Sequence, residues 1–512
     1  MPSYSDKFIA PASLCYNTAS LRRTCSIFDI VAVGGGKLVM GNTCEMRAAK
    51  REKLWKQLVE EYEKRFSNSH QLQQKAVGRL VDGGSHTARL FPPYPCWIRS
   101  AQGSHVQDLD DHNLIDFWQG HFANLLGHNP PVITHALADA LDHRYGLQTG
   151  MQHVEEEELA ELICRCVGAE KVRFTTSGSL ATMYAILLAR TYTGRQLVLK
   201  VGGGWHGAQP WGLKGVHFGA HGYDQSESEG LPTPFLQEIL VTRFNDPASL
   251  EENFRKDGDR IACFIVEPFI GGGGLIAAQP AFLETARRLT SHYGALLIFD
   301  EIISGFRFRA GPLAASYGIE PDLMTLGKII GGGMPVACVT GRADVLDQCG
   351  KRVGRRARFE GGTYSAHPLA MLAGGTMLRY LIAHENEIYP ALNDKGARLR
   401  QIAQRAFESE GIEVHLAGEP SAVMSGSSMF SLNFPYGSQT FSDRPDVLND
   451  PEKYDIELKE RVAKVAFLLE GAFVIHAGGA LSEAHSEEDL EQMKAICQAV
   501  AHRFQQAGLS GD

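Results

Sequence analysis

The chain has 512 residues, of which 44% are hydrophobic and 21% are charged, as is ordinary for a folded globular protein with more than one domain. Its net charge of -9 argues against nucleic acid or an anionic membrane as the main partner, because both attract basic surfaces. The ten cysteines have no regular framework, and no apolar run approaches the length of a membrane span. We therefore expect a cytoplasmic protein with reduced thiols.

The first part of the chain predicts a helix followed by loops and a hairpin. Residues 45–77 carry apolar side chains at helical spacing among many Lys and Glu, which predicts the helix. Residues 81–97 are rich in Gly and Pro and predict a loop or an edge strand. Residues 104–117 predict a hairpin whose turn lies at residues 110–113. Sustained periodicity is missing before residue 45, so we expect a weakly ordered extension there.

From residue 131 onward, helical patterns alternate with short apolar strands, of which "IACFIVEP" and "ALLIFDEI" are examples. This alternation predicts an α/β fold with a mostly parallel sheet. After residue 390 the pattern changes to strands such as "SSMFSLNF" and a closing amphipathic helix, which predicts a smaller α+β domain. The expected divisions are an extension at 1–44, an N-terminal helix and small-domain segment at 45–130, a large α/β domain at 131–390 and a small domain at 391–512.

A candidate phosphate site follows the strand "VRFTT". Ser177, Gly178 and Ser179 come between that strand and a predicted helix. The free N–H groups and the dipole of a helix N-terminus hold phosphate well. The alternative is an ordinary serine N-cap, which the same residues also fit.

A second glycine-rich stretch, "VGGGWHG", matches the dinucleotide-binding pattern G-x-G-x-x-G after a strand. We reject that interpretation because Pro210 follows closely and predicts no helix, and because Asp224, at the spacing of the ribose-binding acid, lies in a polar loop. Trp205, next to His206, offers instead a flat ring that could stack on an aromatic cofactor, with a packed core aromatic as the alternative.

Two charged residues at strand ends predict the chemistry. Asp300 ends the apolar strand "ALLIF", where ligand sites of parallel sheets lie, and its carboxylate could keep a heteroaromatic nitrogen protonated. Lys328 ends the strand pattern "PDLMTLG", and a desolvated lysine amine can attack a carbonyl to form a Schiff base. A serine nucleophile elbow, a zinc-protease motif, a phosphate loop and a histidine metal cluster are all missing from the sequence, so we expect no metal.

In the order of these motifs, followed by "GGTYSAHPLAM", the chain resembles the class III aminotransferases of fold type I, which depend on pyridoxal 5'-phosphate (PLP). It is most similar to the group of glutamate-1-semialdehyde aminomutases and β-amino-acid aminotransferases. The resemblance covers roughly residues 81–504, and the pair "LIFDEIISGFR" and "TLGKIIGGGMPV" carries most of it. It implies a seven-stranded sheet in the large domain and a homodimer with shared active sites.

The resemblance also assigns roles around the cofactor ring. Lys328 would form the Schiff base with PLP and then move a proton as general base and acid. Asp300 would pair with the pyridine nitrogen. Ile302 would pack on one face of the ring and Trp205, with His206 after it, on the other, where the family usually has tyrosine.

Further roles concern the phosphate and the surroundings of the ring. Ser177, Gly178 and Ser179 would hold the phosphate. Thr363 of "GGTYS" would reach the phosphate of the neighbouring subunit. Glu267 of "VEP" would lie near the cofactor behind the residues that contact it.

On the substrate side, Arg89 resembles the arginine that grips a substrate carboxylate, which a bidentate contact would orient. His121 and His476 are the other candidates for substrate binding. The donor and acceptor of the amino group would be small molecules, and the substrate would bear a carboxylate.

The chain departs from the family pattern where the substrate should lie. Leu180 replaces an acid after the phosphate-binding residues, and His367 replaces the Asn of "SGNPLAM". Ala477 stands where the aminomutases carry a Glu, and His476 stands near an Arg of the β-amino-acid enzymes. These departures favour transfer of the amino group between two molecules, with the aminomutase reaction as the alternative. Other PLP chemistry, a PLP-binding protein without catalysis and a nicotinamide oxidoreductase fit less well.

Overall fold

The computed structural model describes residues 37–219 and 222–510. The chain separates into two compact units, Met1–Ala48 and Ala49–Asp512, and all that follows concerns the second. The expected weak order of the extension falls mainly on residues outside the described ranges. The expected domain divisions at residues 130 and 390 stay a prediction. Of the helices within the described ranges, none combines the length and hydropathy that crossing a bilayer requires.

A seven-stranded sheet with the order β4-β12-β11-β10-β7-β5-β6 forms the centre of this unit. All its strands run parallel except β12, which is antiparallel to both of its neighbours. The prediction of a mostly parallel sheet is therefore confirmed. Its strands are β4 (Lys171–Thr175), β5 (Leu197–Val201), β6 (Ile239–Thr242), β7 (Ile261–Val266), β10 (Leu296–Glu301), β11 (Leu323–Leu326) and β12 (Ala337–Gly341).

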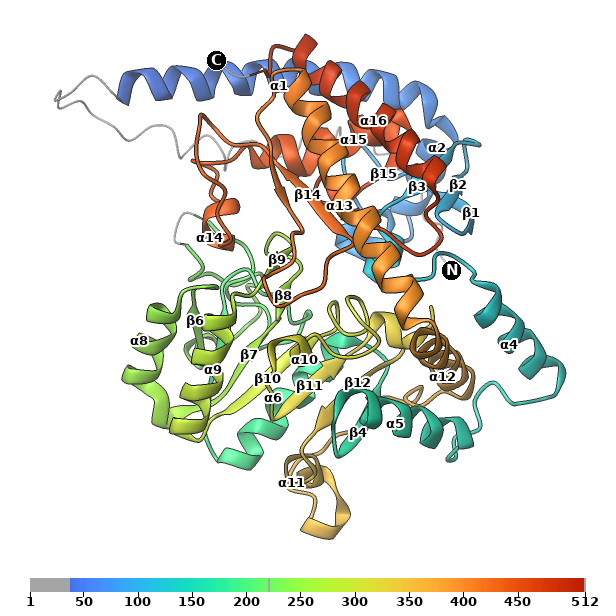
Figure 1. The fold of residues 1–512 in the computed structure, drawn as a ribbon, viewed down its shortest axis with the longest axis vertical. Coiled ribbons are helices and arrows are strands. Elements are labelled where there is room, and N and C mark those ends of the chain that lie inside the picture. The colour runs from blue at the N-terminus through green and yellow to red at the C-terminus, as the bar shows by residue number, and fades with distance from the viewer. Residues whose placement is uncertain (1–36, 220–221, 511–512) are drawn as a thin grey trace, which may run out of the picture. The chain divides into compact units, whose positions relative to one another are not determined.

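Helices cover both faces of the sheet, as Figure 1 shows, because successive side chains of a buried strand point to opposite faces. Leu296 and Ile298 of β10 join the apolar cluster formed with α6, whereas Leu297 and Phe299 join the larger cluster that contains α8 and α9. The helices on the sheet are α6 (Gly178–Thr193), α8 (Pro247–Asp257) and α9 (Pro280–Tyr293).

The smaller α+β part combines the two ends of this unit. Strand β15 of the C-terminal part pairs in parallel with β3 of the N-terminal hairpin in the sheet β1-β2-β3-β15. The predicted hairpin is confirmed as β2 and β3. A three-stranded sheet, β13-β14-β16, completes this part. The strands are β1 (Ile98–Gln102), β2 (His105–Asp108), β3 (Asn113–Asp116), β13 (His415–Ala417), β14 (Met429–Asn433), β15 (Ala472–Phe473) and β16 (Gly478–Ala480).

The helix predicted over residues 45–77 is in fact two helices, α1 (Lys37–Arg65) and α2 (Ser67–Val77). The break lies at Phe66, whose backbone is not helical (φ −110°, ψ 42°). Its ring is fully buried and stacks on Tyr62 at 4.2 Å between ring centroids. Core packing of this aromatic pair therefore overrides the helical periodicity at one residue.

The remaining elements connect these layers. The two-stranded ribbon is β8 (Phe269–Ile270) with β9 (Ile276–Ala277). The segment α3 (Gln119–Phe122) is a single turn whose backbone is left-handed. The other α-helices are α4 (Pro131–Asp142), α5 (Val154–Val167), α7 (Thr233–Gln237), α10 (Ala314–Tyr317), α11 (Ala343–Leu346), α12 (Pro368–Ala383), α13 (Glu385–Ser409), α14 (Pro445–Leu448), α15 (Ala463–Glu470) and α16 (Glu487–Gln506).

Candidate active site

A cavity of about 470 Å³ lies where the carboxyl ends of β4, β10 and β11 meet the N-terminus of α6. Parallel sheets bind ligands at this edge, because their connecting loops leave a crevice there. Most of the residues singled out for the cofactor lie in its wall. They are Ser177, Gly178, Ser179, Trp205, His206, Glu267, Asp300, Ile302 and Lys328.

Asp300 is buried in this wall and is held by three hydrogen-bond donors. Strand alternation puts it on the same face as α6, and puts Glu301 on the other. Its Oδ2 accepts from His206 Nδ1 at 2.7 Å, and its Oδ1 accepts from Thr325 Oγ1 at 2.9 Å and from Ile302 N at 3.2 Å. A carboxylate has about four acceptor positions, so one remains for a donor in the cavity.

Lys328 follows β11 directly and has a left-handed backbone conformation, with φ +49°. A residue with a Cβ is strained there by about 1–3 kcal/mol, and such strain gathers at functional sites. Burial lowers the pKa of the Lys328 amine, while the nearby carboxylates of Asp300 and Glu267 act in the opposite direction. A lowered pKa raises the share of free amine, which is the nucleophilic and basic form.

The turn from β4 into α6 is packed tightly against both neighbouring loops. Ser177 is the N-cap of α6 and its side chain accepts from Leu180 N at 3.4 Å, so the ordinary capping role is also present. A Cβ at Gly207 would lie 2.4 Å from Ser179 Oγ. A Cβ at Gly178 would lie 3.2 Å from the Ile302 side chain. A residue with a Cβ would therefore clash at Gly207 and would be tight against Ile302 at Gly178.

The loop after β5 presents Trp205 to the cavity, with 40% of the residue exposed. Glu267 holds this loop: its Oε1 accepts from Trp205 N at 2.9 Å and its Oε2 from Gly271 N at 3.0 Å. Burial, together with Asp300 nearby, raises the pKa of Glu267 to about 8. Residues 202–219, which follow β5, form no helix, so the rejection of a dinucleotide site agrees with the described structure.

The residues expected on the substrate side are not all brought together. Arg89 Nε donates to His121 Nε2 at 3.1 Å, beside the cavity-lining Gly120. His476 is instead paired with Glu460, Nδ1 to Oε2 at 2.7 Å, and does not line the cavity.

Thr363 also lies outside this cavity. Its carbonyl oxygen accepts from Gln148 Nε2 at 2.5 Å, and its loop lines a separate hollow. A reach from Thr363 to the phosphate of a neighbouring subunit stays a prediction.

Comparison with known proteins identifies a family for this chain. Residues 87–413 match the class-III aminotransferase family. The chain belongs to this family. It is 32% identical over 429 residues to the glutamate-1-semialdehyde 2,1-aminomutase of Methanosarcina acetivorans, covering 83% of this chain and 96% of the relative.

Solved structures of this family share the fold. An omega-transaminase from Sphaerobacter thermophilus superimposes with a TM-score of 0.76 at 30% identity, covering 86% of this chain and 98% of that one. A beta-phenylalanine aminotransferase from Variovorax paradoxus gives a TM-score of 0.75 at 26% identity, over 88% and 96% of the two chains. Class III aminotransferases are PLP-dependent enzymes, so the predicted fold, enzyme class and cofactor are confirmed.

The cavity of this class III aminotransferase fits PLP on three counts. The free acceptor position of Asp300 suits a protonated ring nitrogen. The N-terminus of α6, closed by Gly207 against Ser179, suits a phosphate. The Lys328 amine shares the cavity with both and suits an aldehyde.

Sequence reasoning missed two buried polar residues that support the site. Thr325 is opposite Asp300 in the β10–β11 register and donates to it. Lys200 of β5 is fully buried, and its Nζ donates to the carbonyl oxygens of Gly204, Gly212 and Lys214 at 2.8–3.1 Å, which ties down the loop that carries Trp205. Burial lowers the pKa of Lys200 to about 7. A polar residue inside an otherwise apolar strand, as in "LMTLG" and "LVLKV", is the signal that could have found both.

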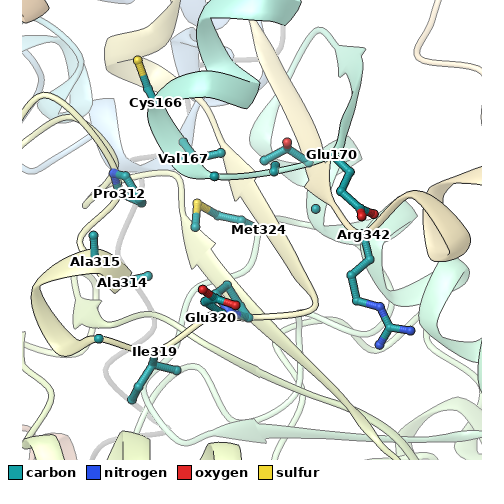
Figure 2. A pocket seen from close by; sticks show the side chains of 16 residues that line it. Cys166, Val167, Glu170, Pro312, Ala314, Ala315, Ile319, Glu320, Met324 and Arg342 are labelled. Carbon is teal, nitrogen blue, oxygen red and sulfur yellow. The ribbon is translucent and has the colours of Figure 1, made fainter.

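A second cavity, of about 550 Å³, lies at the opposite edge of the sheet (Figure 2). Its lining includes Glu170, directly before β4, and Pro321, shortly before β11. Arg342, which also lines it, forms ion pairs with Asp322 and Asp344. The charge of Arg342 is thus already balanced by two carboxylates that lie outside this cavity.

Proposed function

We propose that this enzyme is an aminotransferase that moves an amino group from an amino acid or amine to a carbonyl acceptor, with PLP attached to Lys328 through a Schiff base. One observation carries the proposal. The lysine amine, the triply held Asp300 carboxylate and the phosphate-binding turn at Ser177 share one cavity. PLP, when bound, supplies an electron sink for the substrate carbon that bears the amine.

The side chains have separate tasks in this reaction. Asp300 would keep the ring nitrogen protonated, and His206 and Thr325 hold the carboxylate in position. Ile302 and Trp205, which line the cavity, would hold the ring between them and exclude water from it. Lys328 takes up the proton of the substrate carbon at Nζ and returns it, because its lowered pKa leaves the amine free to act as a base.

The phosphate of the cofactor is proposed to lie at the N-terminus of α6. Ser177 and Ser179 offer hydroxyl donors, and Gly178 lets the backbone N–H groups approach. Glu267 supports the site from behind through Trp205 N.

Transfer between two molecules is favoured over the aminomutase reaction, which returns the amine to the same molecule. The structures described above at 30% and 26% identity are those of transaminases. Ala477 replaces the acid that the aminomutases carry at this position, and it is buried with a left-handed backbone (φ +49°). The aminomutase name of the Methanosarcina relative keeps that reaction as the second candidate.

The substrate is proposed to bear a carboxylate that Arg89 binds. Within the described residues, no acceptor contacts the two terminal amino groups of Arg89, whose Nε is already engaged with His121. Two parallel N–H groups match the two oxygens of a carboxylate.

The enzyme is proposed to act as a homodimer with shared sites. An apolar patch of four strongly exposed side chains flanks the loop that carries Thr363, and the Gln148–Thr363 hydrogen bond joins its two segments. Contiguous exposed apolar residues mark protein interfaces. The patch consists of Leu147, Met151, Val154 and Tyr364, each 61–76% exposed.

The test begins with the cofactor. We expect purified protein to take up PLP, and borohydride reduction to fix it covalently to the peptide that contains Lys328, detected by mass spectrometry. Lys328→Ala should take up PLP without becoming labelled. A wild-type protein that does not bind PLP would contradict the proposal.

Incubating the PLP-loaded enzyme with one amine donor and no acceptor distinguishes transfer from isomerisation. Transfer leaves one equivalent of carbonyl product and an aminated cofactor, visible as a change of its absorption. An enzyme that converts glutamate 1-semialdehyde to its amino isomer, and forms no carbonyl product from any donor, would support the aminomutase instead.

A further inference from the structure

Four consecutive residues, Gln119–Phe122, have left-handed backbones, with φ values of 48°, 61°, 62° and 66°. We call this segment the left-handed turn. Three of its residues carry a Cβ, and L-residues visit this conformation as single residues and not in runs. A sequence keeps such a run only where surrounding contacts over-determine it, which happens mainly at functional sites.

Buried polar groups hold both ends of the left-handed turn. Asp116 Oδ1 accepts from Trp118 N at 2.8 Å and from Gln119 N at 3.1 Å, at its start. At its end, the fully buried Arg307 donates through Nη2 to the carbonyl oxygen of Phe122. The turn therefore has one conformation, and the direction of its side chains is set.

The left-handed turn places the His121 ring between two other rings and an arginine. Its centroid lies 4.2 Å from that of Trp118 and 4.6 Å from that of His86. Arg89 Nε donates to His121 Nε2 at 3.1 Å, so the proton of the neutral imidazole is on Nδ1. Gly120, the preceding residue, lines the cavity that contains Lys328.

His121 stays neutral in this place. Burial is the main cause that lowers its pKa to about 3, and the neighbouring groups of His86, Arg89 and Lys328 act in the same direction. A neutral ring can accept from Arg89, whereas an imidazolium would repel it. The contact that orients Arg89 is therefore present across the working pH range of an ordinary enzyme.

We propose that His121 is a positioning residue that fixes the guanidinium of Arg89, so that its two terminal amino groups face a carboxylate on the amine donor. This inference rests on the proposed function and deepens it. It makes the enzyme selective for amine donors that carry a carboxylate over amines of the same skeleton that lack one. The selectivity arises in Arg89, and His121 acts through it.

Two variants separate this role from a structural one. His121→Asn suits the left-handed backbone, since asparagine adopts it readily, but its amide is too short to reach the position of Nε2. His121→Gln brings a carbonyl oxygen to that position and should restore the contact. Both variants keep a neutral polar side chain, and circular dichroism and PLP uptake check that both are folded.

The reactive probes are 3-aminobutanoate and 2-aminobutane, which differ by a carboxylate against a methyl group. In His121→Asn we expect KM for 3-aminobutanoate to rise about tenfold, since the variant loses one hydrogen bond that orients a charged group. The kcat value for 3-aminobutanoate should not change, and neither should kcat/KM for 2-aminobutane. His121→Gln should recover most of the loss.

The unreactive probes are butanoate and butanamide, whose binding to the PLP-loaded enzyme is measured by calorimetry. His121→Asn should weaken butanoate and leave butanamide unchanged. In an Arg89→Ala background, His121→Asn should add no further loss, because non-additivity reports residues that act through one another. A full additional loss, equal losses for both ligands or no butanoate binding to the wild type would overturn the inference.

The calorimetric measurement distinguishes this inference from the proposed function. A wild-type enzyme that binds butanoate with the expected His121 dependence, yet transaminates neither donor, contradicts the proposed aminotransferase reaction and supports the role of His121. An enzyme that transaminates both donors, with a KM for 3-aminobutanoate that neither variant changes, contradicts the role of His121 alone.

Discussion

At the scale of single residues, the site depends on which face of a strand a side chain occupies. Asp300 and Glu301 are adjacent in sequence, yet they point to opposite faces of β10. Asp300 reaches the cavity and is held by His206 and Thr325. Glu301 faces the other way, where its carboxylate accepts from Leu313 N at 2.6 Å and from Ala314 N. One acid faces the cavity and the other holds a loop.

Replacement of Asp300 by asparagine should lower kcat by about 10²–10³-fold, the usual effect of removing one preorganised electrostatic partner. The fold should persist, because Asn still accepts from Thr325 and Ile302. Steady-state kinetics with PLP uptake measured in parallel check this. Thr325→Val, which removes one of the three donors, should cost much less activity. Equal activity of Asp300→Asn and wild type would contradict the role of the carboxylate.

Lys328→Met should stabilise the protein without PLP. Burial lowers the pKa of the Lys328 amine below the ordinary 10.5, so the unfolded chain binds a proton there before the folded chain does. Wild type therefore loses stability as the pH falls below 10.5, until the folded-state pKa is reached, and the variant does not. The gain in melting temperature should be larger at about pH 7 than at about pH 10.

Thermal melts of the PLP-free proteins measure this difference. Lys171→Met is the control, because Lys171 is about half exposed and pairs with Asp347 at the surface. It should change stability little. A melting temperature of Lys328→Met below that of wild type at neutral pH would show that the amine is not strained by burial.

At the scale of elements, two segments meet at the end of the cavity where the phosphate is proposed to lie. They are the N-terminus of α6 and the loop after β5. The helix supplies free N–H groups, and Gly207 lets the loop close against Ser179. Lys200 keeps that loop in place through three backbone carbonyls. A side chain of the buried strand β5 thus fixes the conformation of the loop that forms this part of the cavity wall.

Gly207→Ala should weaken PLP binding, because its Cβ would lie 2.4 Å from Ser179 Oγ. Gly194→Ala is the matched control. Both glycines have left-handed backbones, with φ +83° and +71°, but the space at Gly194 is open. Both variants should lose about 1–2 kcal/mol of stability from backbone strain. Only Gly207→Ala should lose PLP affinity in an absorption titration, and equal affinities would contradict the close approach.

At the scale of the whole molecule, the active site occupies the large sheet, and the residues around Arg89 come from the N-terminal part. Strand β15 pairs with β3, so the C-terminal part also supports that region. The apolar patch lies on yet another surface, beside Thr363. The site is thus assembled from separate parts of the chain, and Thr363, a predicted phosphate ligand, lies outside its cavity. This arrangement is consistent with the proposed homodimer.

Met151→Glu should dissociate that homodimer, because Met151 is the most exposed of the four residues of the apolar patch, at 76%, and a charge would resist burial there. Sedimentation velocity should show a monomer, with weaker PLP binding if Thr363 contributes across the interface. Ile98→Glu, which changes an exposed apolar residue of β1 outside the patch, should leave the assembly intact. A monomeric wild type would contradict the proposal.

Five strands of the large sheet (β4, β5, β7, β10 and β11), the helix N-terminus at Ser177 and the two strand-end charges could be predicted from sequence. Each depends on neighbours within a few residues: alternation or an apolar run defines a strand, and a change of pattern defines its end. The order of the motifs along the chain, with Asp300 and Lys328 among them, then carried the resemblance to the family, and the resemblance implied the cofactor.

Other features needed the tertiary structure. The break at Phe66 arises from a buried stacked ring, and His476 is directed to Glu460 by a neighbouring helix. The left-handed turn that aims His121 at Arg89 depends on the distant Arg307, which holds its end, as well as on the nearby Asp116, which holds its start. Sequence alone determined which residues stand at strand ends. Only long-range packing decided where their supporting side chains point, because those directions depend on contacts between segments far apart in the chain.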